Sequence, residues 1–93
     1  MLYVVLWHYT EPLEAIDAVR AAHLAHIERH AQEGVFLAWA RRAPPVGGVI
    51  IAATPDRAKL EEIVAADPYQ RAGVARAEIV DFNPAHVRLT LGG

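Results

Sequence analysis

Hydrophobic positions along this chain follow two different periods. Residues 2–9 form a β-branched and aromatic run, which is typical of a strand. The stretch after this run repeats its apolar positions at helical spacing instead, and four of them form one arc: Leu13, Ile16, Leu24 and Ile27. The pattern therefore predicts a strand followed by a long amphipathic helix.

Breaker residues divide the rest of the chain into further elements. Gly34 is expected to end the long helix, and Thr54 is expected to cap a second helix with Pro55 at its first position. Asp67 begins a short helical turn. The remaining elements are strands at 35–40, 46–52 and 76–82 and a helix at 54–66. The order β-α-β-β-α-β predicts an α+β, ferredoxin-like fold with both helices on one face of the sheet.

The first strand is apolar on both of its faces. Leu2, Val4 and Leu6 alternate with a set that includes Tyr3 and Trp7. We expect aromatic side chains on the open face of the sheet, where a large apolar patch marks an interface. A homodimer packed sheet to sheet is therefore predicted, and the alternating tail at 87–91 is a candidate exchanged edge strand.

Two polar residues interrupt the apolar arc of the long helix. His23 falls within about 20° of Ile16 on a helical projection, and Arg20 lies between Ile16 and Ile27. Burying polar groups without partners is costly. These two side chains are therefore the first candidates for function.

Length and composition narrow the class of protein. The 93 residues suffice for a single domain over 1–93, and the formal charge of −2 does not favour nucleic-acid binding. Without cysteine there is no thiolate metal site and no cysteine nucleophile. The longest apolar run is too short to span a bilayer and no export signal is evident, so a cytoplasmic location is expected. Gly47 and Gly48 do not form a phosphate loop; we expect them to let a neighbouring group approach the strand closely.

A histidine that transfers protons needs an oriented partner, and Asp67 is the best placed carboxylate. It lies at the junction between the second helix and the short helical turn, which a ferredoxin-like fold brings near the first helix. The segment Asp67-Pro68-Tyr69-Gln70 is also a good capping pattern, in which Gln70 reaches back. The two roles are compatible, because one carboxylate oxygen can cap while the other meets the imidazole.

The sequence resembles the YCII-related family of small dimeric α+β-barrel proteins. Residues 20–24 (Arg-Ala-Ala-His-Leu) and 66–74 (Ala-Asp-Pro-Tyr-Gln-Arg-Ala-Gly-Val) match its Arg-x-x-His-Leu and Asp-Pro-Phe/Tyr-x-x-Ala-Gly motifs. The resemblance implies a His–Asp dyad at His23 and Asp67. It also implies a link to folds that carry out cofactor-free proton transfer and elimination on small ring substrates. Residues 38–42 depart from the small-Gly-Pro turn common in the family, and we expect the short loop that follows them to border the pocket.

Other side chains have two open interpretations each. Arg20 either binds an anionic substrate group or forms a structural ion pair, and Tyr69 either packs in the core or lines the pocket. His23, His26 and His30 have a spacing that could present imidazoles to zinc, although the usual ligand pattern is missing. His26 and His30 are otherwise expected at the solvated edge of the arc. No metal or cofactor is predicted.

These observations favour a small cofactor-independent enzyme, a lyase or isomerase acting on a compact organic acid or ring compound. His23 would move the proton, Asp67 would orient the ring, and Arg20 would hold substrate charge. One alternative is a non-catalytic module that binds a small metabolite in the same pocket. A further alternative is a cofactor-free monooxygenase of the same barrel architecture.

Overall fold

A computed structural model describes residues 1–85 of the chain. Seven elements follow one another in the order β-α-β-β-α-α-β: β1 (Leu2–Tyr9), α1 (Leu13–Gln32), β2 (Phe36–Arg41), β3 (Gly47–Ala53), α2 (Arg57–Ala65), α3 (Pro68–Arg71) and β4 (Ala75–Phe82). The candidate exchanged strand at 87–91 lies outside the described residues. Within the described part, no helix is both long and apolar enough to cross a membrane.

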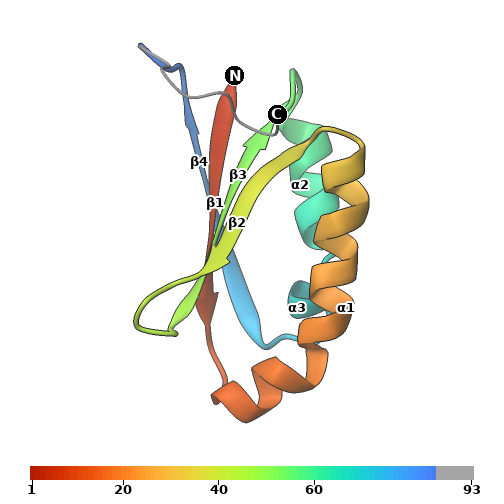
Figure 1. The fold of residues 1–93 in the computed structure, drawn as a ribbon, viewed down its shortest axis with the longest axis vertical. Helices are drawn as coiled ribbons and strands as arrows, with labels where there is room; N and C mark the ends of the chain where they lie inside the picture. The colour runs from red at the N-terminus through yellow and green to blue at the C-terminus, as the bar shows by residue number, and fades with distance from the viewer. Residues whose placement is uncertain (86–93) are drawn as a thin grey trace.

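The strands form one antiparallel sheet in the order β2-β3-β1-β4. Figure 1 shows α1, α2 and α3 covering the same face of this sheet and leaving the other face open. This is the predicted ferredoxin-like arrangement, with α3 as a short addition between α2 and β4. The arrangement places the junction between α2 and α3 beside the middle of α1, where the candidate site lies.

The aromatic side of β1 faces the helices rather than the open face. Tyr3, Val5 and Trp7 are at most 3% exposed and form the core with the helices, whereas Leu2, Val4 and Leu6 are half-buried on the opposite side. The prediction that the aromatic residues cover the open face is therefore wrong. Both sets are apolar, and the larger aromatic rings fill the deeper layer beneath the helices.

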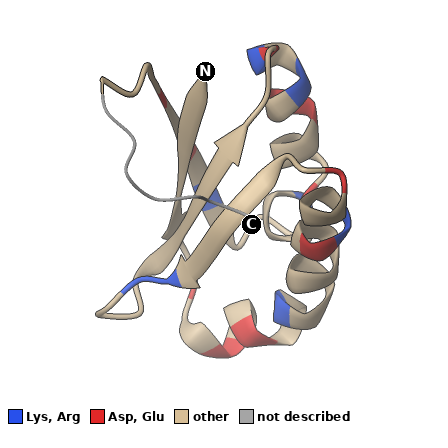
Figure 2. Ribbon diagram, turned by 45° about the horizontal axis from the view of Figure 1, so that its top comes forward, with Lys and Arg blue, Asp and Glu red and all other residues tan. Residues whose placement is uncertain are grey.

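The open face is nonetheless apolar. Val80 and Phe82 of β4 are 43% and 38% exposed, and they pair with Val4 and Leu2 across the sheet. A shallow groove of about 210 Å³ lies between β2 and β3 and is lined by Ala38, Trp39, Ala40, Val49 and Ile51. Figure 2 shows that charged residues gather on the helices and loops, while most of the sheet carries none.

The long helix is rotated relative to the predicted arc. Ile16 and Ile27 are buried as expected, but Leu13 and Leu24 are 40% and 37% exposed. His26, expected at the solvated edge, is only 8% exposed. The helix leans toward α2 and α3, so the flank carrying His26 is covered and the flank carrying the two leucines is not.

The second helix begins two residues later than predicted. Asp56 is its N-cap, and the carboxylate accepts a hydrogen bond from the backbone N–H of Ala58 at 2.9 Å. Thr54 is buried and its Oγ1 accepts from the backbone N–H of Asp56 at 3.4 Å. Thr54 therefore stabilises the turn before the helix, and Pro55 lies outside the helix.

The two adjacent glycines of β3 have different surroundings, and this makes a matched pair for testing the fold. A Cβ on Gly47 would overlap the Trp7 carbonyl oxygen, whereas a Cβ on Gly48 would make contacts of 3.5–3.9 Å. We expect Gly47→Ala to lower the free energy of unfolding by about 1–3 kcal/mol and Gly48→Ala to change it by less than about 1 kcal/mol. Urea denaturation of both variants measures this; equal unfolding midpoints would contradict the close approach.

Candidate active site

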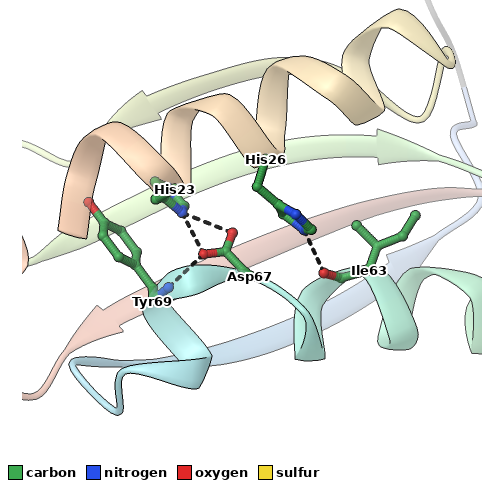
Figure 3. Close-up of polar contacts among 5 residues, drawn as sticks. All are labelled: His23, His26, Ile63, Asp67 and Tyr69. Carbon is green, nitrogen blue, oxygen red and sulfur yellow. Dashed lines mark hydrogen bonds and ion pairs between the residues drawn. The ribbon is translucent and has the colours of Figure 1, made fainter.

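The structure brings His23 and Asp67 into direct contact. His23 Nδ1 lies 2.8 Å from Asp67 Oδ1 and 2.9 Å from Oδ2, so one N–H is shared between both carboxylate oxygens (Figure 3). His23 is 6% exposed and Asp67 is 2% exposed. The pair therefore forms a buried, charge-assisted contact between α1 and the start of α3.

The local sequence explains how Asp67 reaches this position. Asp67 is the N-cap of α3, and its Oδ1 accepts a hydrogen bond from the backbone N–H of Tyr69 at 2.8 Å. Pro68 occupies the first turn, where its fixed φ suits the helix and its missing N–H has no cost. Capping and contact with the imidazole occur together, as the sequence predicted. Among the described residues, however, the Gln70 side chain makes no hydrogen bond that would complete a capping box.

The hydrogen bonds to Asp67 set the tautomer of His23. Because an ionised carboxylate only accepts, His23 Nδ1 carries the proton. In the neutral ring, Nε2 is then left with its lone pair. No residue between 1 and 85 forms a hydrogen bond with Nε2. The atom is thus available to accept a proton from a bound molecule.

Aromatic rings pack against the His23 imidazole and fix the orientation of its ring plane. Tyr69 stacks on His23 with ring centroids 3.6 Å apart and an interplanar angle of 8°. The Trp7 indole meets both rings edge-on, at 5.9 Å from His23 and 5.8 Å from Tyr69. Burial, followed by the neighbouring Tyr9 hydroxyl, raises the pKa of Tyr69 to about 12. Tyr69 thus stays neutral at physiological pH.

A cavity opens beside the dyad between α1 and the β2 side of the sheet. Its lining includes both His23 and Tyr69, together with Trp7, Arg20 and Trp39. Its volume of about 30 Å³ is room for one or two water molecules. The partly exposed Leu24 and Trp39 also line it, so its wall is apolar where it meets solvent. Tyr69 therefore both packs in the core and lines the pocket.

The end of β2 borders the cavity, and the loop that follows it, which was expected there, contributes no lining residue. Trp39, Ala40 and Arg41 line the cavity. Arg41 donates from Nη2 to Asp17 Oδ1 at 2.6 Å and from Nε to the Tyr9 hydroxyl at 3.2 Å. Arg41 and Tyr9 were not predicted as lining residues, because only the strand pairing brings them beside α1.

Arg20 and Arg41 differ in their surroundings. Arg20 is half-buried at the cavity, and the part of the chain that the structure describes gives it no ion pair. The ion pair expected as one alternative for Arg20 is made instead by Arg41 with Asp17. Arg20 thus presents a cation to the cavity without a carboxylate to neutralise it.

The other two histidines of α1 have separate partners. His26 Nε2 donates to the backbone carbonyl of Ile63 at 2.8 Å, and His30 Nδ1 lies 2.8 Å from Glu33 Oε1 (Figure 3 for His26). Over residues 1–85, no three potential metal ligands come together. His26 is thus a buried structural histidine that ties α1 to α2.

Comparisons with known proteins agree with this architecture. A family model described as a YCII-related domain matches residues 1–83. A search of the curated proteins gave no match.

Three solved structures share the fold. The first is a 5-chloro-2-hydroxyhydroquinone dehydrochlorinase (TftG) from Burkholderia phenoliruptrix AC1100, in complex with 2,5-dihydroxybenzoquinone. It is 18% identical to this chain, and the two superpose with a TM-score of 0.74 over 89% of this chain and 94% of the dehydrochlorinase chain. An antibiotic biosynthesis monooxygenase is 27% identical, with a TM-score of 0.56 over 90% and 100% of the two chains. The protein Rv0793 from Mycobacterium tuberculosis is 18% identical, with a TM-score of 0.60 over 92% and 100%.

The burial of His26 predicts a specific pH dependence of stability. Burial lowers the pKa of His26 below 6.5, although its hydrogen bond to Ile63 opposes this shift. The native state therefore binds fewer protons than the unfolded chain, and this contribution to stability is complete above pH 6.5 and lost as the pH falls below it. In urea denaturation, we expect His26→Gln to remove this part of the pH dependence. The prediction is wrong if wild type and variant lose stability in parallel on acidification.

Proposed function

We propose that this chain, which belongs to the YCII-related domain family, is a cofactor-independent enzyme that transfers a proton on a small organic acid or ring compound, in a lyase or isomerase reaction. His23 is the general base and Asp67 its positioning partner. Arg20 holds negative charge on the substrate, and Tyr69 forms part of the pocket wall. No metal or cofactor enters this scheme.

One observation carries the proposal. His23 Nδ1 is bound by a buried carboxylate while Nε2 has no protein partner in the described chain, and the ring borders a cavity. His26 likewise has one ring nitrogen hydrogen-bonded, Nε2 to the Ile63 carbonyl, but it does not line the cavity. The arrangement at His23 instead leaves a basic atom for another molecule.

The reaction begins when His23 Nε2 accepts a proton from the substrate. The C–H or O–H bond breaks, its electron pair moves into the substrate, and Asp67 stabilises the resulting imidazolium. Elimination then expels a leaving group, whereas isomerisation returns the proton to another atom. General acid–base catalysis of this kind supplies roughly 10²–10⁴-fold, so positioning of the substrate in the pocket must supply the rest.

The relatives support the substrate class. The dehydrochlorinase acts, by its name, on a chlorinated hydroxyhydroquinone, and its structure holds a dihydroxybenzoquinone. Removal of hydrogen and chlorine from a ring is an elimination that needs a base and no redox cofactor. A ring compound exceeds the cavity of about 30 Å³, so its binding requires the side chains at the cavity opening, Leu24 and Trp39, to move.

The similarity to an antibiotic biosynthesis monooxygenase favours a second candidate function, cofactor-free oxygenation of an activated ring. In that reaction His23 would deprotonate the substrate before oxygen attacks it. Oxygen consumption distinguishes this chemistry from elimination or isomerisation, which consume none. A module that only binds metabolites would show ligand-induced shifts without product.

A homodimer through the open sheet face belongs to this proposal. The face carries Leu2, Val4, Leu6, Val80 and Phe82, and it has no cover within residues 1–85. A second copy of the same face offers a matching apolar surface, and the fold is that of dimeric α+β barrels. The polar groups His8, Arg76 and Glu78 lie together at one end of the face, where they suit the rim of an interface.

Asp67→Asn tests the dyad directly. The asparagine oxygen can still cap α3, but its amide group donates, so His23 Nδ1 becomes the acceptor and Nε2 the protonated atom. We expect ring ¹⁵N shifts to report this change of tautomer. Chloride release from 5-chloro-2-hydroxyhydroquinone, or deuterium exchange into enolisable ring acids, should fall about 10²–10⁴-fold.

His26→Gln is the matched control, because it alters a buried histidine on the same helix that does not line the cavity. It should reduce stability by about 1 kcal/mol and leave turnover unchanged. If Asp67→Asn leaves both the His23 tautomer and the turnover unchanged, the proposed role of the dyad is wrong.

The dimer prediction is tested by placing a charge on the open face. Val4→Glu puts a carboxylate in the centre of the apolar surface, where pairing with a second copy would bury it at high cost. We expect wild type to sediment as a dimer at micromolar concentration and Val4→Glu as a folded monomer. Ala22→Glu, on the exposed side of α1, should stay dimeric. A monomeric wild type would overturn the prediction.

A further inference from the structure

Trp7 carries a buried donor that the protein itself does not use. Its side chain is 1% exposed, and Nε1 has no hydrogen-bond partner among the residues that the structure describes. Buried tryptophans usually find a partner for this N–H, because leaving a donor unpaired costs its lost hydration. The position of this donor therefore requires a physical reason.

The tryptophan that carries this donor lines the cavity of the candidate active site. Trp7 lines the same cavity as His23 and meets the imidazole edge-on at 5.9 Å. Its Cδ1, the atom bonded to Nε1, lies 3.9 Å from the position of a Cβ built on Gly48, and Gly48 also lines the cavity. The pyrrole edge of the indole thus faces bare backbone, where no side chain fills the space.

We propose that Trp7 Nε1 donates a hydrogen bond to a carbonyl or phenolate oxygen of the ligand, and that it thereby selects flat ring compounds bearing such an oxygen. An indole N–H can only donate, so the group that meets it must be an acceptor. Arg20 also lines the cavity and has no ion pair among the described residues, so its charge favours an oxygen that is or becomes negative. The inference rests on the proposed function, since it places the ligand beside His23.

In that setting Trp7 also takes a direct part in the reaction, as a hydrogen-bond donor to the reacting group. When His23 Nε2 takes a proton from the carbon next to a carbonyl, the C–H bond breaks and its electron pair forms a C=C bond. The carbonyl π electrons move onto oxygen, which becomes an enolate. A preorganised donor at that oxygen stabilises the charge as it develops. The two groups thus act on neighbouring atoms of one substrate.

The experiment follows the Trp7 indole N–H resonance while 2,5-dihydroxybenzoquinone is added. We expect this resonance, assigned by its loss in Trp7→Phe, to move downfield, and toluene, a flat ring without oxygen, to leave it in place. Trp7→Phe should weaken quinone binding about 10–100-fold, the effect of losing a hydrogen bond to a charged group. Tyr3→Phe, which removes a buried hydroxyl from the same face of β1 away from the cavity, should bind the quinone as wild type does.

Two further variants separate loss of the donor from loss of packing. Replacing Trp7 with 3-benzothienylalanine keeps the fused ring but has sulfur in place of the N–H, and it should weaken binding like Trp7→Phe. Gly48→Ala places a methyl group beside the pyrrole edge and should weaken quinone binding without a matching loss of stability. Wild-type affinity in the benzothienyl variant, or failure of the quinone to bind or to move the resonance, would overturn the inference.

Failure of the proposed function gives a different result. In that case the quinone still shifts the Trp7 resonance, but Asp67→Asn does not alter turnover. If the Trp7 inference fails while the dyad is correct, Asp67→Asn abolishes turnover and the benzothienyl variant keeps wild-type affinity.

Discussion

The Asp67 carboxylate holds together the segments on which the site depends. It accepts a shared N–H from His23 on α1 and the backbone N–H of Tyr69 at the start of α3. At 2% exposure, a carboxylate is tolerated only if such donors replace its lost hydration. One buried charge therefore fixes the imidazole tautomer, caps a helix and sets the distance between two elements that are far apart in sequence.

Side chains on the helix-facing side of β1 complete the site. Trp7 meets His23 and Tyr69 edge-on, and Gly48 on the neighbouring strand leaves the space next to it unfilled. The resulting cavity has rigid aromatic walls and a basic nitrogen. Its partly exposed side, which includes Leu24, is the part of the wall with the least packing to hold it. The dyad is thus closely packed, whereas the cavity wall at Leu24 is partly exposed.

The two faces of the sheet differ in what covers them. Side chains on the helix side form the core and the cavity, while Val4, Val80 and the other apolar side chains of the open side have no cover within residues 1–85. Strand alternation makes this division possible, because neighbouring residues of β1 point to opposite faces. A side chain on the open face therefore lies on the opposite side of the sheet from the dyad.

The sequence by itself determined the order of the elements and the capping of α3, because local periodicity and capping residues encode these features. The meeting of His23 with Asp67 was expected from the resemblance to the YCII-related family and from the way a ferredoxin-like fold brings their two segments together. The sequence did not determine which face of β1 is covered, since both alternating sets are apolar and either could lie inward. It also misplaced the rotation of α1, burying Leu24 in place of His26. That rotation depends on how α2 and α3 pack against the helix. Contacts between distant segments decide such choices, and they exist only once the chain is folded.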